Sequence, residues 1–368
     1  MRQLVAALHT CLLADIPVIL WGPPGTGKTA TITYLAKKLG WHLEVMVGAT
    51  RDRTDFGGFP VAQGGEVSLA PMPWVKRLMN AGKRSILFLD ELSSTPEDVR
   101  PALLRVINER QAGDHYLPGR IVAAANPGDL AVGGLELEPP IANRMVHLEW
   151  DVPPSEWARG LREGFEVLYP ELPGEAPEPQ GEIQWATDMV ALYVERNPLH
   201  AYMLPKGEEA GRAWASYRTW TMAARALGWA RALGYGEEVA RLLVVGAVGK
   251  VGYSFLAFLQ ELDLPDPKEV LRNPALLPSR EDRAYATLMA VASTAVAEWK
   301  GEVWRQAWRV LGYAAQRGQA DLAVPAAGRL LRGLAKAREE RREAFPVPEE
   351  AKRFLPLMEK VAEMREGR

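Results

Sequence analysis

A glycine-rich stretch near the start of the chain has the residue types and spacing needed to hold phosphate groups. In "WGPPGTGKTA", two glycines separated by four residues are followed at once by a lysine and a threonine, the P-loop pattern. Glycines let backbone N–H groups close around phosphate oxygens, the lysine adds a positive charge, and the threonine hydroxyl joins a Mg²⁺ shell. The predicted nucleotide-binding residues are Gly22, Pro23, Pro24, Gly25, Thr26, Gly27, Lys28 and Thr29.

Two adjacent carboxylates end an apolar run further along the chain. "SILFLDEL" places Asp90 and Glu91 at the tip of a predicted buried strand, where acids are normally avoided. We expect Asp90 to join Thr29 in holding Mg²⁺, and Glu91, on the opposite face of the strand, to polarise an attacking water. The simpler alternative is that the two acids cap a helix.

A third apolar run, "RIVAAANPG", brings Asn126 to a strand end, where its amide could orient the same water. Asn-Pro also starts turns, so this residue alone leaves both interpretations open. The stretch "PPIANRM" poses a similar question for Arg144, because most arginines near a helix end are surface cations. Only the rest of the chain can favour a chemical role for it.

In their order along the chain, these motifs resemble those of AAA+ ATPases. More narrowly, "GPPGTGKT", "LFLDEL", "INERQAGDHYLPGRIVAAANP", "PPIANR" and "YRTWTMAARA" resemble the MoxR branch, which is related to the dynein-like and chelatase groups. The resemblance covers the first 150 residues closely and continues more loosely to about residue 250. It implies a Mg²⁺-dependent ATPase with four further site residues: the catalytic base Glu91, the sensor 1 residue Asn126, the arginine finger Arg144 and the sensor 2 residue Arg218.

Arg144 directly precedes the last predicted core strand, where a doubly wound order would turn it away from the P-loop of its own chain. It would then act on a neighbouring copy, which predicts a head-to-tail ring. The resemblance implies a hexamer and a protein client that the ring remodels or matures, with a von Willebrand factor A domain protein as one candidate. Two alternatives use the same core: a nucleic-acid translocase of restriction type and the motor subunit of a metal chelatase.

Alternating β-rich and amphipathic runs predict an α/β fold, with a parallel sheet flanked by helices. The expected strands are "PVILWG", "HLEVMVG", "SILFLDE", "RIVAAAN" and "MVHLEW". Helical periodicity dominates after Pro153, and the many tryptophans there are expected to pack in cores. The predicted parts are an AAA+ P-loop core over 1–152, an all-α lid over 153–250 with a Pro/Glu-rich loop at 170–182, and a helical C-terminal region over 251–368.

Glycine pairs around a short β-prone run predict a hairpin in the segment 55–74. The segment 109–120 is also expected to form a hairpin, before the strand that ends at Asn126. The resemblance implies that such hairpins face a central pore or a partner. Surface turns without a role are the equally weighted alternative.

Composition, net charge and cysteine count limit the classes of protein to which this chain can belong. Hydrophobic residues make up 48% and charged residues 24%, values typical of a folded globular chain. The net charge of -2 gives no reason to expect nucleic acid as the main partner. Cys11 is the only cysteine, which excludes an intrachain disulfide and fits a cytoplasmic protein. We expect no signal peptide, no metal site beyond Mg²⁺ and no membrane insertion, with the apolar stretch "LLVVGAVGKVGYSFLAFL" as buried helix.

Overall fold

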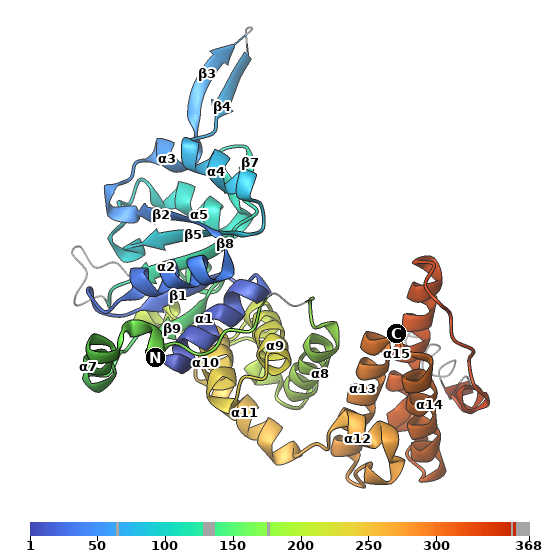
Figure 1. The fold of residues 1–368 in the computed structure, drawn as a ribbon. Coiled ribbons are helices and arrows are strands. Elements are labelled where there is room, and N and C mark those ends of the chain that lie inside the picture. The colour runs from blue at the N-terminus through green and yellow to red at the C-terminus, as the bar shows by residue number, and fades with distance from the viewer. Residues whose placement is uncertain (64–65, 128–136, 175–176, 355, 358–368) are drawn as a thin grey trace. The chain divides into compact units, whose positions relative to one another are not determined.

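The computed structural model describes residues 1–63, 66–127, 137–174, 177–354 and 356–357, and it contains a parallel sheet near the N-terminus (Figure 1). Five strands lie in the order β2-β5-β8-β1-β9, and every neighbouring pair is parallel. They are β1 (Val18–Trp21), β2 (His42–Val47), β5 (Ser85–Asp90), β8 (Arg120–Ala125) and β9 (Val146–Glu149). These strands coincide with the five predicted runs, and the predicted α/β class is confirmed.

Helices cover both faces of the sheet. On one face, Leu89 of β5 joins a core with residues of α4 (Pro73–Ala81) and α5 (Arg100–Glu109). The preceding residue, Phe88, is also fully buried but points to the opposite face, where α2 (Lys28–Leu39) contacts β2 and β5. Burial on both faces explains why the central strands read as continuous apolar runs without polar alternation.

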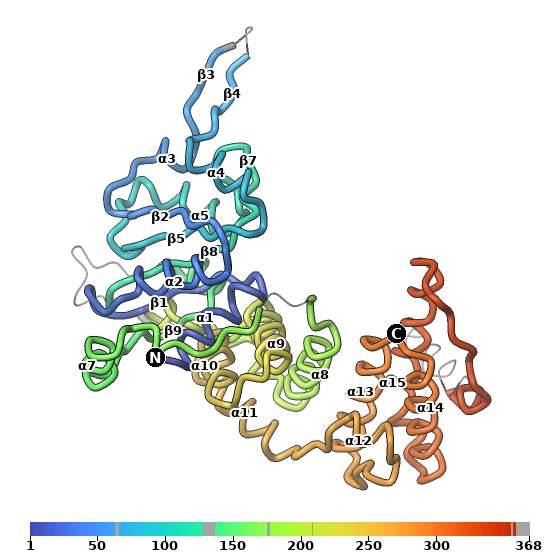
Figure 2. Tube along the Cα trace, viewed as in Figure 1, coloured from blue at the N-terminus to red at the C-terminus, as the bar shows by residue number. Residues whose placement is uncertain are grey.

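Both predicted hairpins are present. The first follows the short helix α3 (Arg53–Gly57) and projects from the sheet-bearing part of the chain (Figure 2). The second is much shorter and leads into β8. Their strands are β3 (Phe59–Gln63) with β4 (Glu66–Ala70), and β6 (Gln111–Ala112) with β7 (His115–Tyr116). Residues 64–65, at the turn of the first hairpin, lie outside the described residues.

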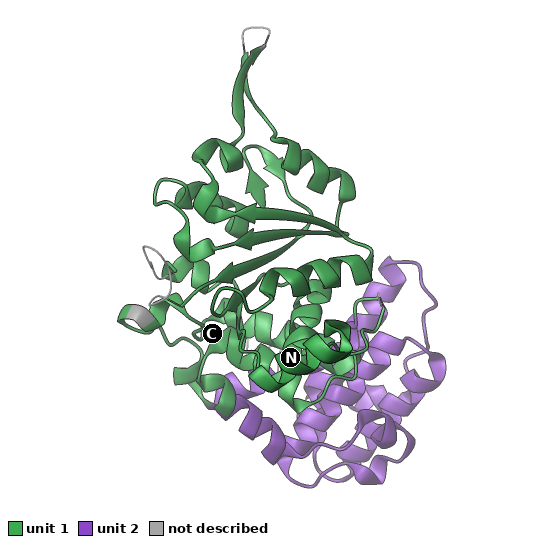
Figure 3. Ribbon diagram, turned by 60° about the vertical axis from the view of Figure 1, so that its left-hand side comes forward, with its two compact units in different colours: residues 1–178, 197–253 green, residues 179–196, 254–368 purple. Residues whose placement is uncertain are grey.

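The chain divides into two compact units (Figure 3). The first comprises Met1–Glu178 and Asn197–Tyr253, and the second comprises Pro179–Arg196 and Ser254–Arg368. The predicted loop at 170–182 ends earlier than expected, because α8 (Gln180–Arg196) begins within it. Glu182 lies in the first turn of this helix, where a carboxylate is favourable. Residues 175–176 of the predicted loop lie outside the described residues.

The first unit contains five more helices, all within the part of the chain that the structure describes. The N-terminal helix packs against two helices that follow β9 in the sequence. Ser216 caps the first of these two by accepting a hydrogen bond from the backbone N–H of Thr219 at 3.2 Å. The five are α1 (Arg2–Ala14), α6 (Pro139–Ala142), α7 (Pro154–Glu163), α9 (Tyr217–Ala232) and α10 (Glu237–Val248).

The apolar stretch that we expected to be buried helix forms two helices. Gly249 ends α10 with φ 73°, in the left-handed region, and α11 (Val251–Leu262) starts two residues later. Phe255 and Leu262 of α11 are fully buried. Among the described residues, no helix combines the length and the apolar character needed to cross a membrane.

Helices are the only regular elements among the described residues of the second unit. Its core is built around Trp304 and Trp308, which are both fully buried, as predicted for these tryptophans. Arg329 forms an ion pair with Asp188 of α8, with one guanidinium–carboxylate distance of 2.7 Å, and this pair joins α8 to the rest of the unit. The other helices are α12 (Pro267–Arg272), α13 (Glu281–Glu298), α14 (Gly301–Gln316) and α15 (Ala320–Glu339).

Short 3-10 helices connect the main elements. They are η1 (Gly48–Thr50), η2 (Leu92–Ser94), η3 (Phe165–Leu168), η4 (Pro198–His200), η5 (Gly207–Gly211), η6 (Pro274–Leu276) and η7 (Glu349–Arg353).

His147 of β9 is a buried titratable group in the first unit. Its Nδ1 accepts a hydrogen bond from Trp21 Nε1 at 3.0 Å, so Nε2 carries the proton and donates to the carbonyl oxygen of Ala142 at 2.9 Å. Burial, assisted by the nearby Arg212 charge, lowers the pKa of His147 to about 4. The neutral imidazole is therefore the form that the folded protein accommodates.

We expect this histidine to weaken the fold in acid. Its folded pKa lies below the ordinary value near 6.5, so the unfolded chain binds more protons between these two values. Its contribution is present in full above pH 6.5 and is lost as the pH falls towards 4, by about 1.4 kcal/mol per pH unit. Denaturant unfolding at several pH values should show a shallower pH dependence for His147→Gln. His115→Gln, on the β6–β7 hairpin, is the control, and equal slopes for wild type and His147→Gln would contradict the assignment.

Candidate nucleotide-binding site

The glycine-rich loop joins the end of β1 to the start of α2. Gly25 and Gly27 have φ values of 78° and 85°, in the left-handed region that favours glycine. Gly27 is also the N-cap of α2, so the free backbone N–H groups of the first helical turn face the loop. A helix N-terminus preceded by such a loop binds anions, and a Cβ at either glycine would meet no atom within 4 Å. The loop therefore fits a phosphate chain.

Lys28 holds its ammonium group over this loop. Nζ donates hydrogen bonds to the carbonyl oxygens of Gly22 and Pro23, at 2.6 and 2.8 Å. Burial lowers the pKa of Lys28, and the negative charge of Asp90 opposes that shift. The ammonium is thus positioned beside the loop as a point charge for phosphate oxygens.

The end of β5 brings oxygen ligands to the same place. Asp90 Oδ2 accepts a hydrogen bond from Thr29 Oγ1 at 2.9 Å, and Asp90 Oδ1 accepts one from the backbone N–H of Glu91 at 3.0 Å. A hydroxyl and a carboxylate in contact are the hard oxygen donors that Mg²⁺ prefers. Thr29 and Asp90 therefore fit a magnesium ion, as the sequence predicted.

Glu91 adopts a backbone conformation that is uncommon for a residue with a side chain. Its φ of 54° and ψ of 41° are left-handed, and its side chain is exposed. Such conformations cost of order 1 kcal/mol or more and occur preferentially at functional sites. The turn that follows, η2, is joined to Asn126, whose backbone N–H donates to Ser93 Oγ at 3.3 Å. Asn126 thus lies against the turn that follows Glu91, at the carboxyl edge of the sheet.

Arg144 lies at the other edge of the sheet. β9 runs parallel to β1, with Val146 opposite Val18, so both strands begin at the same edge of the sheet. Arg144 lies just before β9, at that edge. The glycine-rich loop follows β1 and lies at the opposite edge, where both strands end. Its guanidinium is partly buried and donates to the carbonyl oxygen of Pro140 at 2.7 Å. A strand rises more than 3 Å per residue, so the body of the sheet separates Arg144 from its own phosphate loop.

Arg218 lies beside Arg144. Burial lowers the pKa of Arg144, and the positive charge of Arg218 lowers it further. Arg218 is exposed in the first turn of α9, and no hydrogen bond or ion pair joins it to another described residue. Neither arginine forms an ion pair with a described carboxylate. The pair is therefore an uncompensated positive site.

A buried asparagine that the sequence analysis missed holds these two arginines together. Asn143 precedes Arg144 and is only 6% exposed. Its Nδ2 donates to the carbonyl oxygen of Trp214 at 3.2 Å, and its Oδ1 accepts from Ser216 Oγ at 2.7 Å. Because Ser216 is the N-cap of α9, these bonds fix the segment that carries Arg144 to the helix that carries Arg218. No spacing in the sequence signals this long-range contact.

Trp150 is a second residue that the sequence analysis missed. Trp150 directly follows β9, and its Nε1 donates to the carbonyl oxygen of Thr26 at 3.1 Å. This hydrogen bond holds the phosphate loop against the end of β9. A Cβ at Gly22 would collide with the carbonyl oxygen of Trp150, so this glycine is needed for close backbone packing as well as for the loop.

A cavity of about 840 Å³ lies elsewhere in the first unit. It is lined by residues of α10 and of the segment 203–215, together with Glu149 and Arg212, and none of the predicted site residues lines it. Arg212 lies over the ring of Trp21, 3.6 Å from its centroid, and pairs with Glu149 at 3.2 Å. The candidate site is therefore an open edge of the sheet and not this cavity.

A known protein family matches the part of the chain that contains the glycine-rich loop and the sheet. Residues 17–145 match the family described as AAA domain (dynein-related subfamily). Residues 17–145 therefore carry an AAA domain of the dynein-related, MoxR-like type. This match confirms the resemblance inferred from the motifs, and an AAA domain implies nucleotide binding.

Individual relatives share only part of their length with this chain. Protein NorQ of Paracoccus denitrificans (strain Pd 1222) is 30% identical over 159 residues, which are 40% of this chain and 57% of NorQ. Lon protease 1 of Sorangium cellulosum (strain So ce56) is 34% identical over 110 residues, which are 27% of this chain and 13% of that protein. The chain thus spans less than two thirds of either relative.

A crystal structure from Cytophaga hutchinsonii ATCC 33406 aligns with 70% of this chain and 88% of that chain, at 16% identity and a TM-score of 0.41. This likeness is too distant to carry an argument.

Gly48 offers a test of the geometry behind Asp90 and Glu91. A Cβ at Gly48 would collide with Thr95 Oγ1, a buried oxygen without a hydrogen-bond partner among the described residues. Gly48→Ala should therefore lower the free energy of unfolding by about 1 to 3 kcal/mol, as for overpacking. Adding Thr95→Ala removes the colliding hydroxyl and should recover most of the loss. Denaturant titration of the four proteins measures this, and a double variant no more stable than Gly48→Ala would contradict the packing argument.

Proposed function

We propose that this protein is a Mg²⁺-dependent ATPase that works as a head-to-tail ring and couples ATP hydrolysis to the remodelling or maturation of a partner protein. The observation that supports hydrolysis is the contact between Thr29 and Asp90 beneath Lys28, with Glu91 next in the chain. Binding alone would require the phosphate loop but would not require an exposed carboxylate beside the metal position.

Each residue of the carboxyl edge has a role in this proposal. The backbone of Gly22–Gly27 surrounds the phosphates, and Lys28 faces the β- and γ-phosphates. Thr29 and Asp90 hold Mg²⁺, which when bound neutralises the charge that develops on the phosphate oxygens. Glu91 accepts the proton of the attacking water.

Asn126 orients that water through its side-chain amide, as sensor 1. Its backbone N–H donates to Ser93 Oγ in η2, the turn that directly follows Glu91. A polar side chain in this place helps to align the water for an in-line attack.

Arg144 and Arg218 act on the nucleotide of the neighbouring subunit. Both lie near the edge of the sheet that is remote from their own phosphate loop, and neither is neutralised within the described residues. An arginine aimed at the transferred phosphoryl group stabilises the charge of the transition state. Repeated head-to-tail contacts close into a ring, and the AAA+ resemblance favours six copies.

The β3–β4 hairpin is the proposed contact with the client protein. Phe59 is 60% exposed and Val67 is 73% exposed, on a ribbon that projects from the sheet-bearing unit (Figure 1). Exposed apolar side chains on a projecting element are typical of interaction sites. The MoxR resemblance makes a von Willebrand factor A domain protein the first partner to test, by co-purification with wild type and with a Phe59→Ser, Val67→Ser variant.

Glu91→Gln should bind ATP but turn it over about 10² to 10⁴ times more slowly, because the amide cannot accept the proton of the water. Lys28→Ala is the matched control, since it should weaken ATP binding itself. Nucleotide affinity and phosphate release are measured on the same preparations. Equal turnover in Glu91→Gln and wild type would remove Glu91 from the mechanism.

Arg144→Ala should bind ATP nearly normally and hydrolyse it about 10³-fold or more slowly, because its charge matters only in the transition state. Mixing this variant with Glu91→Gln should restore part of the activity, since mixed rings place an intact Glu91 beside an intact Arg144 of a different subunit. Phosphate release is followed across mixing ratios under conditions in which the subunits exchange. A lack of recovery at every ratio would show that Arg144 does not act across subunits.

A further inference from the structure

Helix α7 presents an apolar stripe that the described part of the chain leaves uncovered. Trp157 and Leu161, four residues apart on one helical face, are 52% and 59% exposed. Gly160 is the one buried residue of this helix, and it lets the ring of Phe165 lie against the backbone. An amphipathic helix normally buries its apolar face, so this stripe needs a partner.

A second apolar surface surrounds a hollow near the arginine pair. Tyr202, Leu204 and Tyr217 are 52%, 55% and 72% exposed, and the two tyrosine rings lie 6.2 Å apart. With Pro139 and Pro140 they line a hollow of about 480 Å³, which Arg218 also borders. We call this surface the tyrosine hollow.

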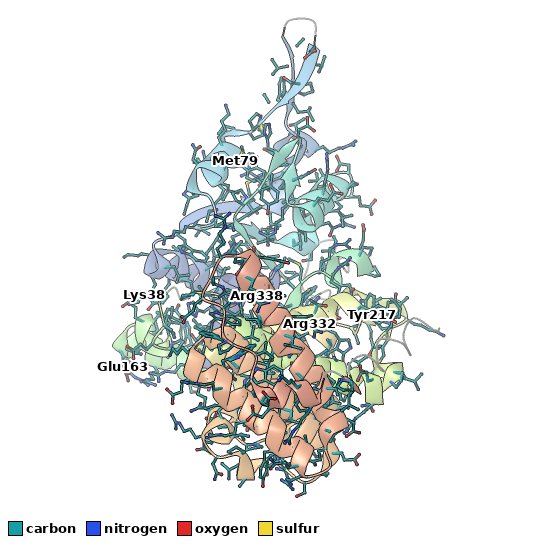
Figure 4. The ribbon with its side chains drawn as sticks, turned by 90° about the vertical axis from the view of Figure 1, so that its right-hand side faces the viewer. Lys38, Met79, Glu163, Tyr217, Arg332 and Arg338 are labelled. Carbon is teal, nitrogen blue, oxygen red and sulfur yellow. The ribbon has the colours of Figure 1, made fainter. Side chains whose placement is uncertain are left out.

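The stripe and the tyrosine hollow lie on opposite flanks of the first unit. The segment after α7 is held against α2, where the rings of Tyr34 and Tyr169 lie 4.3 Å apart. In Figure 4, Lys38 of α2 and Glu163 of α7 lie on one flank and Tyr217 lies on the other. The α7 stripe thus lies on the flank that carries α2, the helix that follows the phosphate loop. The tyrosine hollow lies on the flank that carries Arg218.

We propose that α7 of one copy docks into the tyrosine hollow of the next copy. The inference rests on the proposed ring, in which the flank that carries Arg144 meets the phosphate-loop flank of a neighbour. That contact brings the stripe and the hollow to the same interface, and it places the uncompensated arginine pair against a nucleotide and the acidic residues Asp90 and Glu91.

A symmetric contact between two tyrosine hollows is disfavoured. It would place Arg218 and Arg144 of one copy close to the same arginines of the other, and like charges without acids between them repel. The contact between unlike flanks avoids this repulsion and repeats from copy to copy. It is therefore the heterologous contact that a ring requires.

Thiol cross-linking tests the contact, because Cys11 is fully buried and no other cysteine is present. Chains with Leu161→Cys and chains with Leu204→Cys are mixed with ATP and Mg²⁺ and treated with a short bifunctional thiol reagent. Each variant alone should stay uncross-linked, the mixture should give dimers, and a chain with both changes should give a ladder of higher oligomers. Met79→Cys, at an exposed position on α4, replaces Leu161→Cys as the control and should give none.

Self-association gives a second readout. Leu161→Asp should raise the protein concentration that gives half-maximal specific ATPase activity by about thirtyfold, the change expected for loss of an interface hot spot. Nucleotide affinity should be unchanged, because Leu161 lies outside the phosphate loop. Met79→Asp is the control, because it replaces another exposed apolar residue. Its half-maximal protein concentration should equal that of the wild type.

The outcomes separate this inference from the proposed function. Suppose that mixing Arg144→Ala with Glu91→Gln restores activity, but the cysteine pair gives no cross-link and Leu161→Asp assembles normally. The proposed docking of α7 is then wrong, and the proposed ring is still supported. Cross-linked dimers of a single variant would overturn the head-to-tail arrangement. If wild-type activity does not depend on protein concentration and mixing restores nothing, both proposals fail.

Discussion

The parallel direction of all five strands is the constraint on which the site depends. In such a sheet, whatever follows a strand emerges at one edge and whatever precedes a strand lies at the other. The phosphate loop, Glu91 and Asn126 each follow a strand and Asp90 ends one, so they converge although they are far apart in sequence. Arg144 precedes a strand and is therefore excluded from that edge.

Unusual backbone conformations then position the phosphate loop and the two carboxylates at this edge. Gly25 and Gly27 take up left-handed conformations in the loop, and Glu91 takes up the same conformation despite its side chain. The space behind the Asp90–Glu91 turn is so narrow that residue 48 has no room for a Cβ. The Thr95 hydroxyl fills this space, so side-chain packing behind the turn limits the positions that the two carboxylates can take.

A buried side-chain amide positions Arg144 and Arg218 at the opposite edge of the sheet. A buried amide, Asn143, satisfies both its donor and its acceptor capacity across a long separation in sequence, and so joins the end of α6 to the start of α9. Two like charges are held side by side by neutral groups. Such an arrangement costs electrostatic energy in the isolated chain and is relieved by an anion, which is the physical reason to expect a nucleotide from another copy there.

The sequence by itself determined the five strands, the two hairpins and the positions of Lys28, Thr29, Asp90 and Glu91 at or after the ends of strands, because these depend on apolar runs, glycine spacing and acids at strand ends, which are local properties. The proximity of Arg218 to Arg144, the bonds of Asn143, the support of Thr26 by Trp150 and the assignment of α8 to the second unit were decided only by the tertiary structure. Each of these brings together residues that are distant in the chain, through one or two hydrogen bonds, an ion pair or proximity alone. Such a contact leaves no periodic trace in the sequence, since its energy depends on which surfaces folding brings together.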